Sequence, residues 1–308
     1  SARASCGLNA AIARNIFALP FAGSALVFDM GVGSSKEIAF DKVSADVSEV
    51  LVPDFVCYAF HPYGVFGIKL DGSYTAANKE RWSEAKAALP HPEDDSLQCF
   101  HACGIYRINP AGSLKVNKER WGEVAGVVRS PQDPDITYVF HGLGVYKVSS
   151  ADGSYTKVSK TTWSATTALV LSPSEPDFVF VFHSHGLFKV KLSDLSYERL
   201  GSHKWSQATA AVYDPVNEAA LVFHHWAIYR VKLADGSYET LSKERWSEAK
   251  AAVNSTEGAA LVIHSQGLFS VNMADGTYTK VSGDRWSDVK AVCPLGPLAF
   301  ASVCCCSE

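Results

Sequence analysis

Six tryptophans recur at near-constant intervals along this chain of 308 residues. A similar block follows each of them: a stretch of small residues, an apolar run, a segment with an aromatic residue, and a turn. A unit of this length cannot bury its apolar side alone and must pack against its neighbours. The chain is therefore predicted to be an array of structural repeats, with intervals of 39, 42, 42, 41 and 40 residues between Trp82, Trp121, Trp163, Trp205, Trp246 and Trp286.

The pattern inside each repeat predicts four short antiparallel strands. Apolar and polar residues alternate with period two between turn residues, which is typical of strands. Linkers such as residues 141–144 are too short for a parallel crossover. Asp-Gly dipeptides, which suit tight hairpins, separate the third and fourth segments at positions 71, 152, 235 and 275. A four-stranded meander of about forty residues matches one blade of a β-propeller.

Counting the repeats predicts an all-β fold, a seven-bladed β-propeller in one domain covering residues 1–308. Residues 10–28 superpose without gaps on residues 251–269, and Val43-Ser44 resembles a worn Trp-Ser pair. Repeats would then start near residues 5, 43, 82, 121, 163, 205 and 246, with a half repeat at 286–303. We expect the two strands of this half repeat to close the ring by pairing with residues 25–30 and 37–40. A ring of eight blades is the alternative.

The residues after each tryptophan predict the order of strands within a blade. Ala249, Ala251 and Ala252 are small enough for a crowded innermost strand around a central channel. The chain would then run from the inner to the outer strand of each blade. This order places the linkers between second and third strands on the same face as the loops that enter the next blade. The tryptophans themselves are predicted to pack between blades, with sugar stacking as the alternative.

A histidine ends the predicted second strand in six repeats. Equivalent positions on different blades lie too far apart for bonds of about 2 Å to one metal ion, so no metal site is expected. We predict a structural role, in which each histidine caps a strand edge and hydrogen bonds near the Trp-Ser pair. Ligand contact is the alternative for His61, His101, His141, His183, His224 and His264.

Two sets of loops on one face supply the candidate ligand-binding residues. The linkers after the histidines differ from repeat to repeat and include Tyr63, His185, His225 and Trp226. Trp226 lies outside the repeat register, which makes it the first candidate for ligand contact. The loops before the repeated tryptophans are rich in charge, and a solvated rim is the alternative explanation for their candidates Arg81, Arg120, Arg245 and Arg285.

The composition limits the classes of partner and the cellular compartment that we expect for this protein. A net charge of −4 shows no basic footprint, so nucleic acid is not expected. Polar residues interrupt the apolar stretch 8–30, so no membrane span is expected. An Asn-Ser-Thr acceptor at position 254 in a predicted loop, together with eight cysteines, favours a secreted or extracellular protein. The disulfide candidates are a clasp between the chain ends and a hairpin pair, involving Cys6, Cys99, Cys103, Cys304, Cys305 and Cys306.

Motifs for catalysis are absent from the sequence. It has no GxSxG elbow, no HExxH pair and no phosphate-cradling glycine loop. Its polar residues recur evenly, whereas a propeller enzyme concentrates asymmetric polar residues at the channel mouth. We therefore expect a protein that is not an enzyme and has no cofactor.

The blade pattern resembles that of tachylectin-like and tectonin-like propeller lectins. The resemblance rests on Trp-Ser-x-Ala-x-Ala-x-Val followed by Val-Phe-His-x-x-Gly and an aromatic segment. Hemopexin-like repeats share some of these features but form four blades. The lectin resemblance implies multivalent binding of glycans or glycoproteins through several weak, equivalent sites. The alternative is a protein-interaction or structural scaffold propeller with protein partners in an extracellular or surface assembly.

Overall fold

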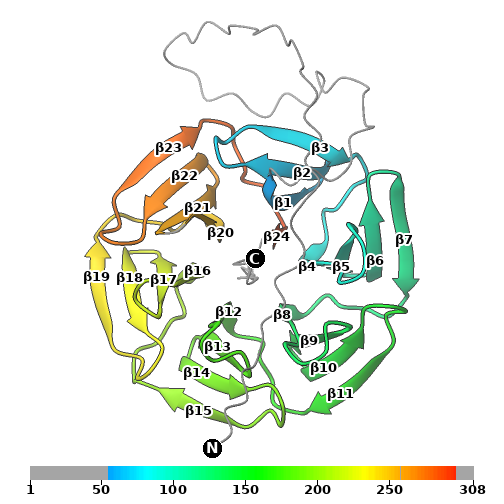
Figure 1. Ribbon diagram of the computed structural model, residues 1–308, viewed down its shortest axis with the longest axis horizontal. Coiled ribbons are helices and arrows are strands. Elements are labelled where there is room, and N and C mark those ends of the chain that lie inside the picture. The colour runs from blue at the N-terminus through cyan, green and yellow to red at the C-terminus, as the bar shows by residue number, and fades with distance from the viewer. Residues whose placement is uncertain (1–54, 257, 296–308) are drawn as a thin grey trace, which may run out of the picture. The chain divides into compact units, whose positions relative to one another are not determined.

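The computed structural model describes residues 55–256 and 258–295, all within one compact unit that spans residues 35–308. These residues form six four-stranded sheets arranged as the blades of a β-propeller around a central axis (Figure 1). From the innermost strand outwards, blade 1 contains β24 (Ala291–Pro294), β1 (Phe55–His61), β2 (Gly64–Lys69) and β3 (Tyr74–Asn78), and blade 2 contains β4 (Ala85–Pro90), β5 (Leu97–His101), β6 (Gly104–Asn109) and β7 (Gly112–Asn117). In the same order, blade 3 contains β8 (Val124–Arg129), β9 (Ile136–His141), β10 (Gly144–Ser149) and β11 (Tyr155–Ser159), and blade 4 contains β12 (Thr166–Leu171), β13 (Phe178–His183), β14 (Gly186–Lys191) and β15 (Tyr197–Leu200). Blade 5 contains β16 (Ala208–Asp214), β17 (Ala219–His224), β18 (Ala227–Lys232) and β19 (Tyr238–Ser242), and blade 6 contains β20 (Ala249–Thr256), β21 (Ala259–His264), β22 (Gly267–Asn272) and β23 (Tyr278–Ser282).

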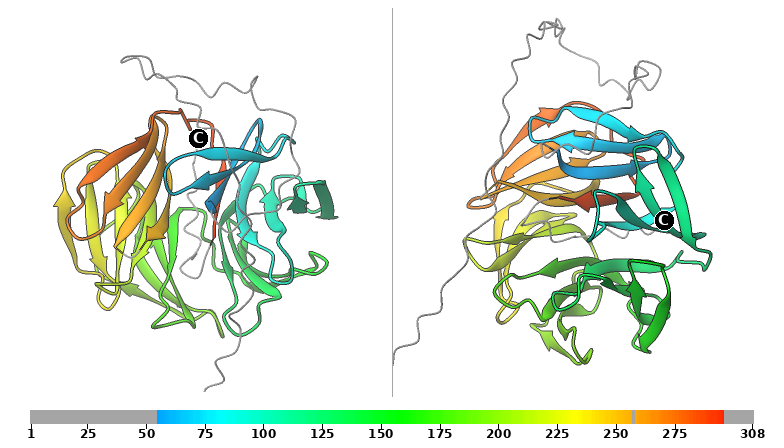
Figure 2. Two further views of the ribbon diagram at one scale, coloured as in Figure 1. Left: turned by 45° about the horizontal axis from the view of Figure 1, so that its top comes forward. Right: turned by 45° about the vertical axis from the view of Figure 1, so that its right-hand side comes forward.

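The strand order within each blade confirms the predicted chain direction. All strand pairs of the six sheets are antiparallel, and the strand that follows each repeated tryptophan is innermost. Inner strands of neighbouring blades contact one another around the ring, as Figure 1 shows for β4, β8, β12, β16, β20 and β24. The tilted views in Figure 2 show twisted sheets standing side by side.

The prediction of seven blades was wrong, because the described residues form six. β24, the inner strand after Trp286, pairs with β1. The ring therefore closes on the segment 55–78 and uses one inner strand for each of the six repeated tryptophans. The sequence count treated two N-terminal copies without a tryptophan as blades. The copy near residue 5, the start of the copy near residue 43 and residues 298–303 lie outside the described residues.

The tryptophans pack between adjacent blades, as predicted. Trp82 is buried against Phe60 of blade 1, with ring centroids 5.8 Å apart, and against Tyr106 of its own blade at 5.4 Å. Equivalent edge-to-face contacts recur around the ring, and each hydrophobic cluster joins strands of two neighbouring blades. Burial of large aromatic rings supplies the main favourable term in such packing. The seams between blades are thus the hydrophobic core of the protein.

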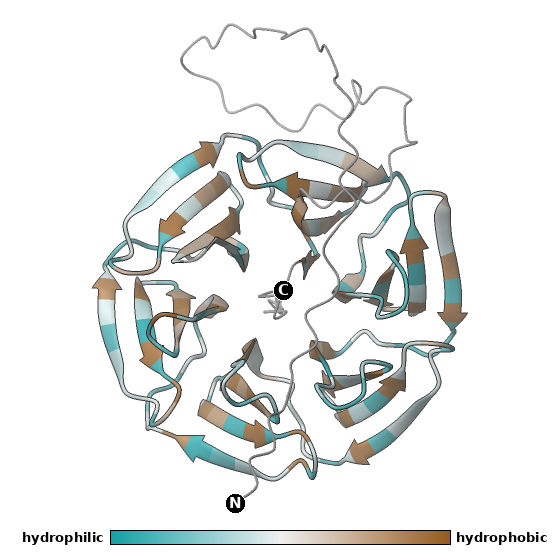
Figure 3. Ribbon diagram, in the orientation of Figure 1, coloured by the Kyte–Doolittle hydropathy of each residue, from teal (hydrophilic) through white to brown (hydrophobic). Residues whose placement is uncertain are grey.

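The outer strands meet water, and their sequence changes accordingly. β11 and β23 share the sequence Tyr-Thr-Lys-Val-Ser and are mostly exposed. Figure 3 shows hydrophobic residues predominating in the inner strands and hydrophilic residues interspersed along the outer ones. The Asp-Gly hairpins form as expected: Gly153 has a φ of 68°, and Asp152 accepts a hydrogen bond from the Ser154 amide at 2.9 Å.

The closing strand offers a test of the architecture. Val292 in β24 is buried in the cluster between blades 6 and 1, opposite Ala59 of β1. We expect Val292→Asp to lower the free energy of unfolding by about 3 kcal/mol or more, because it buries an unpaired carboxylate where the ring closes. Urea denaturation and hydrogen exchange of the β1 amides measure the effect. Val292→Ala, a control that only loses volume, should cost less, and equal losses would contradict this account of ring closure.

Candidate functional site

One face of the propeller carries the second-to-third strand turns together with the loops that lead into the repeated tryptophans; we call it the turn face. In blades 2 to 6 the first turn residue donates its backbone N–H to the carbonyl of the residue two positions after the tryptophan. The bonds measure 3.0–3.2 Å: Ala102 to Glu84, Gly142 to Glu123, Ser184 to Ala165, His225 to Gln207, and Ser265 to Glu248. In blade 1 this position is Pro62, which has no N–H to donate. Turns and loops are thus joined into one surface, as the sequence predicted.

The recurrent histidines hold these turns in shape. In each turn the histidine Nδ1 accepts a hydrogen bond from the backbone N–H two residues further on, for example 3.0 Å from Leu143 to His141. The other five turns repeat it. Five of the rings, those of blades 2 to 6, also lie edge-to-face with the tryptophan of their own blade. The Nδ1 atoms bond to the backbone of their own turns and not beside the Trp-Ser pair; this contact supports a structural role, and ligand contact stays the alternative prediction.

Burial keeps these histidines neutral. Desolvation lowers the pKa of His61 and His224 to about 4, and it lowers the pKa of the other four turn histidines in the same direction. A neutral ring with its proton on Nε2 leaves Nδ1 free to accept the turn hydrogen bond. The turns therefore depend on the unprotonated imidazole.

Because the turns depend on neutral histidines, we expect the folded protein to lose stability on acidification at a pH higher than the range in which carboxylates titrate. The unfolded histidines bind protons near pH 6.5, roughly their unperturbed pKa, whereas folded His61 and His224 do not until about pH 4, and the pKa of the other four is lowered in the same direction. Stability should be fully present above about pH 6.5 and fall as the pH drops, by at most about 1.4 kcal/mol per pH unit for each histidine. Urea denaturation between about pH 7.5 and pH 5 measures this slope. His224→Gln should make the slope shallower, and a flat profile in the parent protein would refute the assignment.

The tips of the six turns differ although their backbones are alike. Tyr63 is 53% exposed, Leu143 57% and Trp226 47%. The equivalent positions in the other three blades are Cys103, His185 and Gln266. A repeated scaffold thus presents six different side chains on one face.

Three of the predicted site residues come together around Trp226. The Arg245 guanidinium lies over the indole, 4.7 Å from the ring centroid, and the His225 ring lies 4.4 Å away edge-on. The indole N–H donates a 2.6 Å hydrogen bond to Gln207 Oε1. These contacts hold an exposed aromatic ring in one orientation at the seam of blades 5 and 6. Gln207 was not among the candidates, although its position breaks the repeat.

The other candidates lie on the same face but on separate blades. His185 stacks on His183 with ring centroids 5.1 Å apart, and Tyr63 lies 5.3 Å from His61. Three arginines, which precede the tryptophans of blades 2, 3 and 1, are exposed on the rim: Arg81, Arg120 and Arg285. The structure therefore gathers Trp226, His225 and Arg245 and leaves the remaining candidates apart.

The predicted pair Cys99–Cys103 is not formed. Both thiols are free: Cys99 is buried in β5, whereas Cys103 lies at an exposed turn tip with Sγ 3.1 Å from His101 Nδ1. The alternation of β5 points Cys99 into the seam between blades 1 and 2, away from the turn tip. The proposed clasp between the chain ends lies outside the described residues.

This geometry predicts very different reactivities for the described thiols. Cys103 is exposed, whereas burial raises the pKa of Cys99 and raises that of Cys57 to about 12. We expect iodoacetamide to alkylate Cys103 at least about a hundredfold faster than Cys99 or Cys57, since the thiolate is the reacting species. Peptide mapping by mass spectrometry reports each rate, and Cys103→Ser removes the fast product. Comparable rates for the three thiols would overturn the placement of Cys103.

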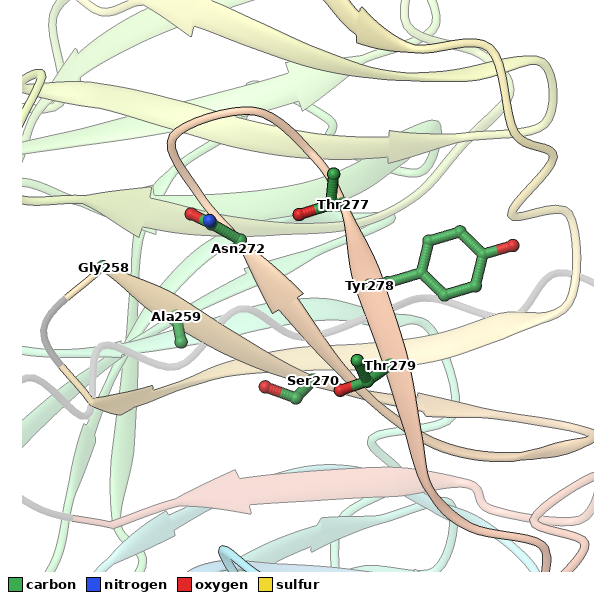
Figure 4. Close-up of a pocket in the computed structure, with 7 residues that line it drawn as sticks. All are labelled: Gly258, Ala259, Ser270, Asn272, Thr277, Tyr278 and Thr279. Atoms are coloured by element: carbon green, nitrogen blue, oxygen red, sulfur yellow. The ribbon is translucent and has the colours of Figure 1, made fainter.

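A polar pocket on blade 6 was missed in the sequence. It has a volume of about 530 Å³, and its polar lining includes Ser270, Asn272, Thr277 and Thr279. Figure 4 shows these side chains on one side of the β22–β23 hairpin, with Tyr278 on the other. In blades 2 to 5 the position of Ser270 holds a long cationic side chain; Arg230, for example, reaches across to the Met273 carbonyl at 2.7 Å. The loss of this cation in blade 6 is the sequence signal that could have revealed the pocket.

The structure also bears on the predicted glycosylation loop, on metal binding and on a membrane span. Asn254 and Ser255 lie in the inner strand β20 and not in the predicted loop. The Ser255 hydroxyl donates a 3.1 Å hydrogen bond across the hairpin to the Ala259 carbonyl. Within residues 55–256 and 258–295, no group of three or more His, Cys, Asp or Glu side chains is arranged to hold a metal ion. No helix in that part of the chain has the length and apolarity to cross a bilayer.

Comparison with known proteins shows the fold and no closer relationship. No family model matches the chain, and no curated protein matches its sequence. A chain in the crystal structure of a nidogen–laminin complex superposes with a TM-score of 0.62 at 7% identity, covering 77% of this chain and 96% of that one. A Bacteroides thetaiotaomicron protein of unknown function gives 0.54 at 13% identity, over 80% and 73%. The extracellular domain of a B. thetaiotaomicron one-component system gives 0.51 at 13%, over 75% of this chain and 34% of that one.

Proposed function

We propose that this protein is a non-enzymatic protein-interaction propeller of an extracellular or surface assembly, and that it binds its partner through the turn face. The observation that carries the proposal is the contrast between six alike turns and six different turn tips. Packing and hydrogen bonding account for the shared positions, the histidine and the tryptophan. They do not account for exposed Tyr63, Leu143 and Trp226, which are the kinds of side chain that anchor protein interfaces.

Rigidity supports the same function. Each turn is held by the Nδ1 of its histidine, and in blades 2 to 6 also by a backbone bond to the segment before the inner strand. A surface that is ordered before binding loses less conformational entropy when a partner docks. The structural neighbours from a nidogen–laminin complex and from the extracellular domain of a sensor system are in keeping with an extracellular binding role.

Glycan binding is a second candidate, and the blade 6 pocket is the observation that favours it. Its Ser, Thr and Asn side chains suit a neutral, hydroxyl-rich ligand. The corresponding position in blades 2 to 5 is cationic, which argues for one such pocket and against a ring of equivalent ones. Ser270→Lys, which restores the residue type of blades 3 and 4, should abolish any signal that the parent protein gives on a glycan array.

Site-specific photo-cross-linking tests the protein-interaction function. A photoreactive amino acid replaces Tyr63, Leu143 or Trp226 in separate variants, which are irradiated with surface and extracellular proteins of the source cells. We expect the same partner to be cross-linked from more than one tip, because neighbouring turns share one interface. Mass spectrometry of the products identifies it.

The matched control is Val216, which is 66% exposed in the β16–β17 loop on the opposite face. It should give no cross-link to that partner. Cross-links from Val216 alone, or from none of the turn tips, would count against the turn face as the binding surface.

A further inference from the structure

Two neighbouring blades lack the carboxylates that their counterparts carry on the turn face. In four repeats the tryptophan is preceded by an acid and an arginine and is followed, two positions later, by a second acid. Blades 4 and 5 lose both acids. The acidic positions are Glu80 and Glu84, Glu119 and Glu123, Glu244 and Glu248, and Asp284 and Asp288; their counterparts are Thr161 and Ala165 in blade 4, and His203 and Gln207 in blade 5.

Blades 4 and 5 each keep one of the two cations that blades 2, 3 and 6 carry before the tryptophan, with Thr162 and Ser202 in place of the other, and their turns add imidazole and indole rings. Lys160 and Lys204 are exposed in the loops before the tryptophans of blades 4 and 5. Their turns carry His185 and the pair His225-Trp226, and Arg245 bounds the sector at the seam with blade 6. We call this region the cationic sector. Because the inner strands of these two blades, β12 and β16, contact each other in the ring, we expect their positive side chains to lie in one region of the turn face.

The cations of this sector form no ion pair within residues 55–256 and 258–295. Among the described residues, no carboxylate lies within ion-pair distance of Lys160, Lys204 or Arg245. In the loops that precede the tryptophans, the acidic repeat pattern resumes at Glu244, on the border with blade 6. An anionic partner would therefore meet positive charge here without the repulsion it meets on the other four blades.

Trp226 provides the apolar part of the same surface. It is 47% exposed, and its position is fixed by Arg245 over the ring and by Gln207 on the indole N–H. Tryptophan and arginine are the side chains most enriched at energetic centres of protein interfaces. Charge and an ordered aromatic ring thus coincide in one place.

We propose that the cationic sector binds an acidic segment of a protein partner, with an apolar side chain of that segment against Trp226 and its carboxylates beside Lys160, Lys204 and Arg245. This assignment rests on the proposed function of the turn face and adds the chemistry of the partner. A protein segment fits better than nucleic acid, because the sector is short and flanked on both sides by acidic repeats.

Peptides of defined charge test the proposal. One probe contains three copies of Glu-Glu-Leu-Gly, and the matched probe has Gln in place of Glu. By calorimetry at low salt, we expect the acidic peptide to bind the full chain about tenfold more tightly than the Gln peptide, and added salt to weaken it. Equal affinities for the two peptides would overturn the proposal.

A variant that restores the acidic residues of the repeat in blades 4 and 5 gives the most specific test. Ala165→Glu with Gln207→Glu installs the residue found at these positions in three other repeats, so the fold should be preserved. It should weaken the acidic peptide by about tenfold, because two carboxylates now repel it. Val216→Glu with Ala151→Glu adds the same charge on the opposite face and should leave binding unchanged. Equal effects of the two double variants would mean that binding depends only on the net charge of the protein, and would refute the assignment of the site to the cationic sector.

Two further results separate this proposal from the function on which it rests. Trp226→Ala should lower the affinity for the acidic peptide by about tenfold. Leu143→Ala should leave this affinity unchanged, since Leu143 lies on a blade that keeps its acids. Partner cross-links from Tyr63 and Leu143 without any from Trp226 would leave the interaction function intact and refute the cationic sector. A single-stranded oligonucleotide that displaces the acidic peptide and binds more tightly would also refute it.

Discussion

The burial of one tryptophan at each seam is the interaction on which the rest of the structure depends. Each ring packs against the preceding blade and against an aromatic residue of its own blade, so neither blade buries its apolar face without the other. An open row of such blades would end in two exposed apolar faces and two free strand edges. Pairing of β24 with β1 removes both, and this is why the C-terminal strand completes the first blade.

This core also explains how a repetitive molecule presents a varied surface. The buried histidines and the backbone bonds between turn and loop fix the turn backbone without using the tip side chain. Stability therefore places few demands on the tips, and neighbouring blades can carry tyrosine, leucine, histidine or tryptophan at the same place. The acids beside the tryptophans of blades 2, 3 and 6 are also exposed, so their loss in blades 4 and 5 changes the electrostatic character of the face and not the core beneath it.

The sequence contained much of the site and little of its geometry. The candidates Trp226, His225 and Arg245 were found because one tryptophan broke the repeat and one loop set was charged. Their mutual contact could not be predicted, since Arg245 is 19 positions beyond Trp226 and leads into the next blade. The hydrogen bond of Gln207 to the indole and the pocket beside Ser270 depend in the same way on which side chains face each other across a turn or a seam.

Periodicity alone determined the class of fold, the four-stranded blade, the inner-to-outer order and the tryptophans at the seams, because these follow from local alternation, short turns and the need to bury large rings. The number of blades was decided only by the tertiary structure. The copy near residue 43 was predicted to be a complete blade, whereas its described strands β1–β3 take their innermost partner from after Trp286, where β24 pairs with β1 and closes a ring of six. Ring closure is a condition on the whole circle, where the angle between packed blades must sum to one turn, and no single repeat encodes it.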